Sequence, residues 1–144
     1  LQAHHRIMEE LIKRLRDPAG SGAYRAARAD EILRAASGSC IRVARIRFAE
    51  KPVLMKNIAA ALEFPHWFGE NWDALEDCLS DLSWREAAGH VLLLEGAEVG
   101  DDFGVLVDVL GSAAEFWASR GTPFFAVFID PAGELPLPEL SGRK

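Results

Sequence analysis

Short apolar runs alternate with amphipathic stretches along the chain. Residues 40–48, 90–95 and 124–129 are rich in β-branched, leucine or aromatic side chains, which is typical of strands. The continuous apolar run 90–95 is typical of a central strand that is covered on both faces or packed tightly on one. Before and between these runs, apolar residues recur at the three- and four-residue spacing of helices that bury one side. The helical pattern covers residues 4–16, 24–36, 53–62, 71–82 and 102–119.

Helical segments separate the three predicted strands, which favours parallel strands joined by crossover connections. The expected fold is therefore a small α/β domain with a three-stranded parallel sheet packed with helices. The loop DPAGSGA, residues 17–23, is expected to link the first two helices. We divide the chain into an N-terminal helical extension (1–38), a main domain (39–131) and a proline-rich tail (132–144) that lies across the surface or is disordered.

The composition is that of one globular domain. With 144 residues, 49% of them hydrophobic and 26% charged, the chain can bury a core without disulfides or metal. Its apolar runs are shorter than the ~20 residues that a membrane helix needs, and its start, LQAHHRIMEE, lacks the apolar stretch of a signal peptide. We therefore expect a cytoplasmic protein that binds no membrane, with Cys40 and Cys78 as reduced thiols.

The net charge of −6 conceals a strong asymmetry. Residues 1–50 carry a charge of +4, and residues 51–144 carry a charge of −10. The acidic part should repel nucleic acid and attract a basic protein. The two N-terminal helices are arginine-rich, which is typical either of an arm that binds RNA or a partner or, the interpretation we favour, of a solvated surface.

The stretch from Glu63 to Trp84 departs most from an average surface. No Lys or Arg occurs between Lys56 and Arg85, although this interval holds six carboxylates. Like charges four residues apart destabilise a helix by about 0.2–0.5 kcal/mol per pair, so an acidic helix face of this kind favours a cationic partner. The acidic side of the predicted helix consists of Asp73, Glu76, Asp77 and Asp81. The side expected to pack on the core consists of Trp72, Leu75, Cys78, Leu79 and Leu82.

Aromatic residues precede this helix. His66, Trp67 and Phe68 are consecutive in a turn between Pro65 and Gly69, and three consecutive rings in a turn cannot all face the core. At least one should be exposed beside the acidic side, as in the hot spots of protein interfaces. The alternative, that Trp67 and Phe68 are core residues under a loop, is equally compatible with the chemistry alone.

An enzyme that holds Mg²⁺ with Asp73, Glu76 and Asp77 is a rival hypothesis. Carboxylates on one helix face point the same way and do not encircle an ion, and the helix offers no histidine or lysine as a base or clamp. His90 is expected to be a strand-end residue, since no second His or Cys stands near it at metal-binding spacing. We therefore predict no catalytic residue, no metal site and no cofactor.

The pattern Gly-Glu-Asn-x-Asp-Ala-Leu-x-Asp-Cys-Leu, which occurs here as Gly69 to Leu79, resembles the signature of the barstar family. These proteins are intracellular inhibitors of secreted bacterial ribonucleases of the barnase type. The similarity is closest over Pro65 to Leu79 and extends more loosely from Ile41 to Ile129. It implies a small three-stranded parallel sheet with helices, and an acidic helix and preceding loop that plug the active site of a ribonuclease.

The resemblance also implies roles for single residues. Asp77 would be the deepest anchor and Asp73 a second charged contact, placed where RNA phosphates would lie, and Trp67 would be an aromatic contact. Glu76 stands where the family pattern has a tryptophan, and residues 1–38 have no counterpart in that pattern. The predicted partner-binding residues are Trp67, Gly69, Asn71, Asp73, Glu76, Asp77 and Ser80.

The function expected from the resemblance is that of an inhibitor, with a possible role as a bacterial immunity protein. Its partner would be a basic ribonuclease of the extracellular type or a related toxin, and it would bind neither nucleic acid nor a membrane. A protein-interaction domain of the same fold without inhibitory activity is the alternative, because a fold does not determine a function.

Overall fold

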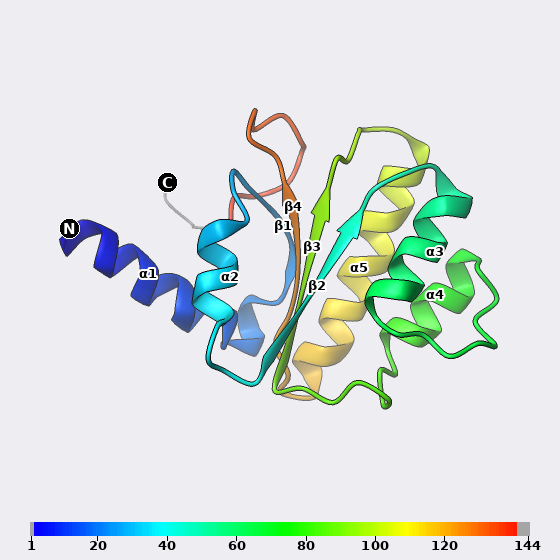
Figure 1. Cartoon of the computed structure of the whole chain (residues 1–144), viewed down its shortest axis with the longest axis horizontal. Coiled ribbons are helices and arrows are strands. Elements are labelled where there is room, and N and C mark those ends of the chain that lie inside the picture. The colour runs from blue at the N-terminus through cyan, green and yellow to red at the C-terminus, as the bar shows by residue number, and fades with distance from the viewer. Residues whose placement is uncertain (1, 141–144) are drawn as a thin grey trace.

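A parallel sheet of four strands, in the order β1-β4-β3-β2, lies between two layers of helices (Figure 1). The structure is a computed structural model that describes residues 2–140, with side chains described from residue 6 onward. The strands are β1 (Gly22–Ala26), β2 (Ile41–Arg47), β3 (Gly89–Glu95) and β4 (Phe124–Ile129). The helices are α1 (Gln2–Leu15), the short 3₁₀ helix η1 (Pro18–Gly20), α2 (Asp30–Ala36), α3 (Lys51–Ala61), α4 (Trp72–Leu79) and α5 (Asp101–Ser119).

The fourth strand, β1, corrects the sequence-based prediction of three strands. The predicted linker 17–23 holds η1 and the start of β1, and the helix predicted to begin at residue 24 begins at Asp30. The local preference of this alanine- and arginine-rich segment is helical, but pairing with β4 overrides it. Tyr24 also stacks on Phe125 of β4 with ring centroids 5.8 Å apart, so tertiary packing determines the local structure here.

The strand order explains why helices cover both faces of the sheet. The connection from β1 to β2 crosses the sheet in one direction, whereas the connections from β2 to β3 and from β3 to β4 return in the other. Because each parallel crossover is right-handed, opposite directions place the connecting helices on opposite faces. α2 therefore lies on one face, and α3, α4 and α5 lie on the other (Figure 1).

Two apolar clusters hold the layers together. One cluster joins α1 and α2 to the sheet, and the other joins α3, α4 and α5 to it. Successive residues of β3 serve the two clusters in turn, since Val91 and Leu93 face α1 and α2 while Leu92 and Leu94 face the other helices. Buried on both faces, β3 is thus the central strand that its continuous apolar run predicted.

The proline-rich tail lies along the outer edge of β1. The amide of Arg25 in β1 donates to the carbonyl of Pro138 at 2.8 Å, and the amide of Leu140 donates to the carbonyl of Arg25 at 2.9 Å. The side chains of Leu135 and Leu140 are buried, one in each apolar cluster. Of the two expectations for the tail, the structure shows a segment packed across the surface, and residues 141–144 lie outside the described residues.

Two expectations from the composition concern the thiols and the membrane. Cys40 is exposed and Cys78 is buried, and both are free thiols. Within residues 2–140, no helix has the length and apolar character that crossing a membrane requires.

Candidate partner-binding surface

Helix α4 begins after a capping asparagine and ends earlier than the sequence pattern predicted. Asn71 is its N-cap, and the side-chain oxygen of Asn71 accepts a hydrogen bond from the Ala74 amide at 2.8 Å. The helix ends at Leu79, not at residue 82 as the pattern predicted. The chain instead turns at Leu82, which adopts a φ of 50° and is only 2% exposed. Leu82 is therefore a core residue, as its spacing suggested, but it reaches the core from a turn.

The two sides of α4 differ as the pattern predicted. Leu75, Cys78 and Leu79 are buried, and Leu75 and Leu79 belong to the apolar cluster that joins α4 to the sheet and to α5. The opposite side exposes Asp73, Glu76 and Asp77, which we call the acidic face. Asp81, predicted as a fourth member on the helix, is also exposed but follows the helix in the turn.

The carboxylates of the acidic face stand free of basic side chains. Among the residues that the structure describes, Asp73, Glu76 and Asp77 form no ion pair. The arginine-rich helices α1 and α2 pack on the other face of the sheet, so their cations lie across the domain from α4 (Figure 1). The acidic face is therefore an unneutralised negative surface.

Cys78 lies directly beneath this surface. Burial, followed by the negative charges of Asp81 and Asp77, raises the pKa of the Cys78 thiol. Because the thiolate is the nucleophilic form, burial and a raised pKa make this thiol less reactive than an exposed one.

The loop before α4 separates its aromatic residues. Trp67 is 63% exposed, the exposed aromatic that the sequence led us to expect. Phe68 packs edge-on against Phe64 with centroids 4.9 Å apart, and Phe64 packs likewise against Trp84 at 6.0 Å. The indole nitrogen of Trp84 donates to the carbonyl of Leu62 at 3.0 Å. Phe64, Phe68 and Trp84 thus pack together beneath the loop, while the ring of Trp67 stays exposed to solvent.

The other predicted contact residues belong to the same loop and helix. Gly69 and Asn71 are exposed, and Ser80, half-buried, is the C-cap of α4. A Cβ atom added to Gly69 would meet the Asn71 side chain at 3.4 Å and the Ala74 side chain at 3.6 Å, which is ordinary packing. The fold itself therefore does not require glycine at this position.

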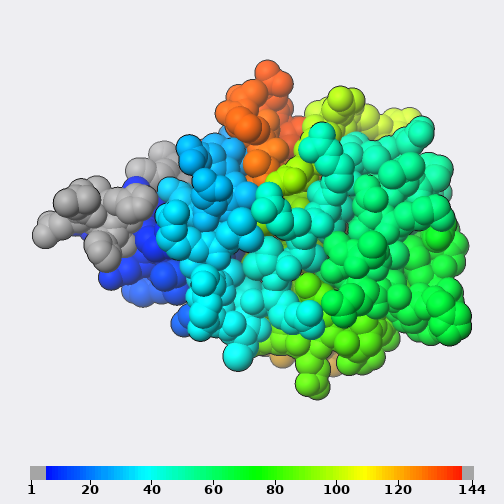
Figure 2. Space-filling view, viewed as in Figure 1, coloured from blue at the N-terminus to red at the C-terminus, as the bar shows by residue number. Residues whose placement is uncertain are grey.

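The sequence interpretation missed two residues of α3 that contact this segment. The Nζ atom of Lys56 lies 3.1 and 3.2 Å from the two carboxylate oxygens of Glu70. The Nζ atom of Lys51 lies 5.6 Å from the centre of the Trp72 ring, a cation–π contact. Neither lysine carries a motif, because the contacts arise only where α3 meets the loop before α4 and the first residue of α4. These stretches of the chain adjoin on the surface in Figure 2.

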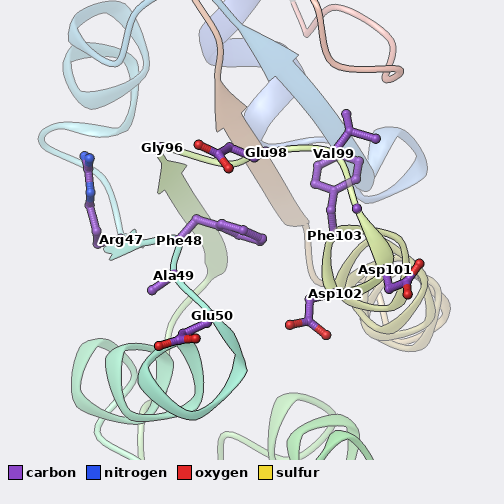
Figure 3. Close-up of a pocket in the computed structure, with 11 residues that line it drawn as sticks. Arg47, Phe48, Ala49, Glu50, Gly96, Glu98, Val99, Asp101, Asp102 and Phe103 are labelled. Carbon is purple, nitrogen blue, oxygen red and sulfur yellow. The ribbon is translucent and has the colours of Figure 1, made fainter.

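The structure also has an open pocket away from α4, at the carboxyl ends of β2 and β3. It has a volume of about 680 Å³ and is lined in part by Arg47, Glu50, Glu98 and Asp102 (Figure 3). This edge is a common ligand site in parallel α/β sheets. Figure 3 shows that the acidic side chains do not converge, since Asp101 points away from Glu50 and Asp102. In the part of the chain with described side chains, no three His, Cys, Asp or Glu residues are grouped to hold a metal ion.

Comparison with known families gives this surface a context. Residues 39–129 match the family model described as Barstar (barnase inhibitor). The match covers more than half of the chain, and the protein belongs to the barstar family, a family of inhibitors and not of enzymes. The matched region contains β2, β3 and β4, so the fourth strand comes from the N-terminal segment outside the match. No curated protein matches the chain.

Proposed function

We propose that this protein inhibits a basic ribonuclease by inserting the acidic face of α4 and the exposed loop before it into the active site. The observation that carries the proposal is the exposed, unpaired carboxylate group of Asp73, Glu76 and Asp77 on a helix within the barstar-family region. A nuclease cleft that binds RNA phosphates presents several cations in a small space. Carboxylates on a helix that packs firmly on the domain can form ion pairs with those cations and so block the cleft without any chemical step.

In this proposal Asp77 is the deepest anchor and Asp73 the second charged contact. Glu76, the residue before Asp77, is also exposed and would add a third negative charge where the family pattern has an aromatic residue. Trp67 would supply the apolar contact area that commonly centres a protein interface. Gly69 and Asn71 would allow close approach of the partner's backbone, and Ser80 would contact it at the far end of α4.

The proposed role is that of an immunity protein that acts in the cytoplasm of a bacterial producer. A negative surface opposite a positive cleft accelerates association, and an inhibitor–nuclease pair of this family is itself a standard example of that effect. Charges farther apart than about 8–10 Å are screened at physiological salt. The association rate constant should therefore fall steeply as salt is added.

The test is inhibition of purified ribonucleases of the barnase type by the wild type and by Asp77→Ala. The expected result is inhibition by the wild type and at least about thirtyfold weaker inhibition by the variant, since removing one partner of a buried charge pair costs about 2–5 kcal/mol, a range drawn in part from this family. The matched control is Glu10→Ala, which removes an exposed carboxylate from α1 on the other face of the sheet. Absence of inhibition by the wild type, or full inhibition by Asp77→Ala, would refute the proposal.

Two alternatives have distinct outcomes in solution. A non-inhibitory interaction domain would capture a basic protein from an extract and lose it in an Asp73→Ala/Asp77→Ala variant, yet leave ribonuclease activity unchanged. A metal-dependent enzyme would bind Mg²⁺ or Ca²⁺ with micromolar affinity in a calorimetric titration.

A further inference from the structure

We propose that Lys56, assisted by Lys51, is a positioning residue that holds the loop 66–71 and the first turn of α4 in the geometry that binds the partner. The inference builds on the proposed function, because it assigns a role in the same interaction. Neither lysine would touch the partner in this role. Their effect would pass through Glu70 and Trp72, the residues on either side of the Asn71 cap.

The first argument is the backbone at Glu70. This residue has a φ of 58°, in the left-handed region that disfavours side chains other than glycine, asparagine and aspartate. It stands directly before the N-cap of α4, so its conformation sets the direction in which the helix leaves the loop. A residue in an unfavourable conformation persists when its surroundings hold it. Here the ammonium group of Lys56 contacts both oxygens of the Glu70 carboxylate.

The second argument is that a lysine of α3 also contacts the residue that follows the Asn71 cap. Lys51, earlier on α3, lies over the ring of Trp72, the first residue of α4. The cap itself is the hydrogen bond from the Ala74 amide to the Asn71 side chain. Two cations from one helix thus fix the residues that flank this bond, and the rest of the loop is supported by Phe68 packed on Phe64.

The third argument concerns charge, because positioning and simple electrostatics predict opposite effects. Removing Lys56 makes the neighbourhood of the acidic face more negative, which by itself should speed association with a cationic partner. If Lys56 orders the loop, its removal also requires the loop to be ordered upon binding, which should speed dissociation. An increased dissociation rate constant, together with an unchanged or increased association rate constant, is therefore the signature of positioning.

The experiment compares the wild type with Lys56→Met, which keeps an unbranched apolar side chain, and with the double variant Lys56→Glu/Glu70→Lys, which restores the pair in reverse. Hydrogen exchange of the amides in 66–71 and at Ala74 is measured without a partner. Binding kinetics to a ribonuclease that the wild type inhibits are measured by surface plasmon resonance. Lys13→Met removes an exposed lysine from α1, on the other face of the sheet, and is the matched control.

We expect Lys56→Met to accelerate exchange in this segment and to raise the dissociation rate constant, each by between about 1.5-fold and fivefold, as for the loss of an exposed ion pair. The reversed pair should restore both values, and Lys13→Met should change neither. Unchanged exchange, or slower dissociation of Lys56→Met, would overturn the inference. If the wild type inhibits no ribonuclease, the proposed function fails, whereas local exchange still decides whether Lys56 orders the loop.

Discussion

His90 should make the stability of this protein fall as the solution becomes acidic. It is the second residue of β3 and is 2% exposed. The centroid of its ring lies 5.3 Å from the centroid of the Trp117 ring and 6.1 Å from that of the Phe124 ring. Burial, then the positive charges of Arg85 and Arg42, lowers the pKa of His90 from 6.5 to about 4. Arg85 is itself 3% exposed, and burial lowers its pKa as well. A proton on His90 would therefore enter an apolar site that already faces two cations.

The sign and size of the effect follow from linkage between protonation and folding. Between pH 6.5 and about 4, the unfolded chain binds a proton at this histidine and the folded protein does not, so acid favours unfolding. The contribution of neutral His90 is fully present above pH 6.5 and lost by about pH 4. With each pKa unit equivalent to about 1.4 kcal/mol, the total loss is about 3 kcal/mol, of which about 2 kcal/mol falls between pH 7 and pH 5.

Urea unfolding at pH 7 and at pH 5 measures this loss. The comparison variant is His90→Phe, which keeps an aromatic ring among aromatic neighbours but cannot be protonated. Carboxylates titrate in both proteins, so their contribution cancels in the difference. The free energy of unfolding should fall by about 2 kcal/mol more in the wild type than in the variant between these two pH values. An equal loss in both proteins would show that His90 is not held neutral, and would refute the reasoning.

Two further predictions concern the N-cap of α4 and the tail. Asn71→Ala should lower the free energy of unfolding by about 1 kcal/mol in a thermal or urea unfolding experiment, whereas Asn71→Asp, which keeps an oxygen acceptor, should lower it much less. A chain ending at residue 133 loses the burial of Leu135 and Leu140, at about 1.5–3 kcal/mol each, and should unfold at a much lower urea concentration. That shortened chain also exposes the edge of β1 and should self-associate in size-exclusion chromatography. The control is Leu135→Ala/Leu140→Ala in the full chain, which loses the same apolar burial but keeps the tail backbone beside β1, and should stay monomeric.

The parts of the fold that depend on local pattern could be predicted from the sequence. The run 90–95 is apolar at nearly every position because β3 is buried on both faces, and this composition leaves few alternatives. β1 could not be predicted in the same way. All five of its residues are half-buried, so it shows no alternation, and its stabilising partners, β4 and the tail, are more than a hundred residues away in the sequence.

In the candidate site, too, some features follow from local sequence pattern and others depend on residues far away in the chain. The exposed face of α4 follows from helical spacing alone, and Asp73, Glu76 and Asp77 are exposed as expected. The end of the helix does not follow, because Leu82 continues the apolar spacing while its backbone leaves the helical conformation without a glycine to mark the turn. The contact of Lys56 with Glu70 depends on how α3 packs against the loop before α4, which no local pattern encodes.

The separation of α1 and α4 by the sheet has a practical consequence (Figure 1). A protein immobilised on a sensor chip through a label on α1 would present α4 to the bulk solution. Fluorophores or affinity handles placed on α1 would therefore leave α4 unobstructed, which makes α1 the place for a label in the binding experiments proposed above.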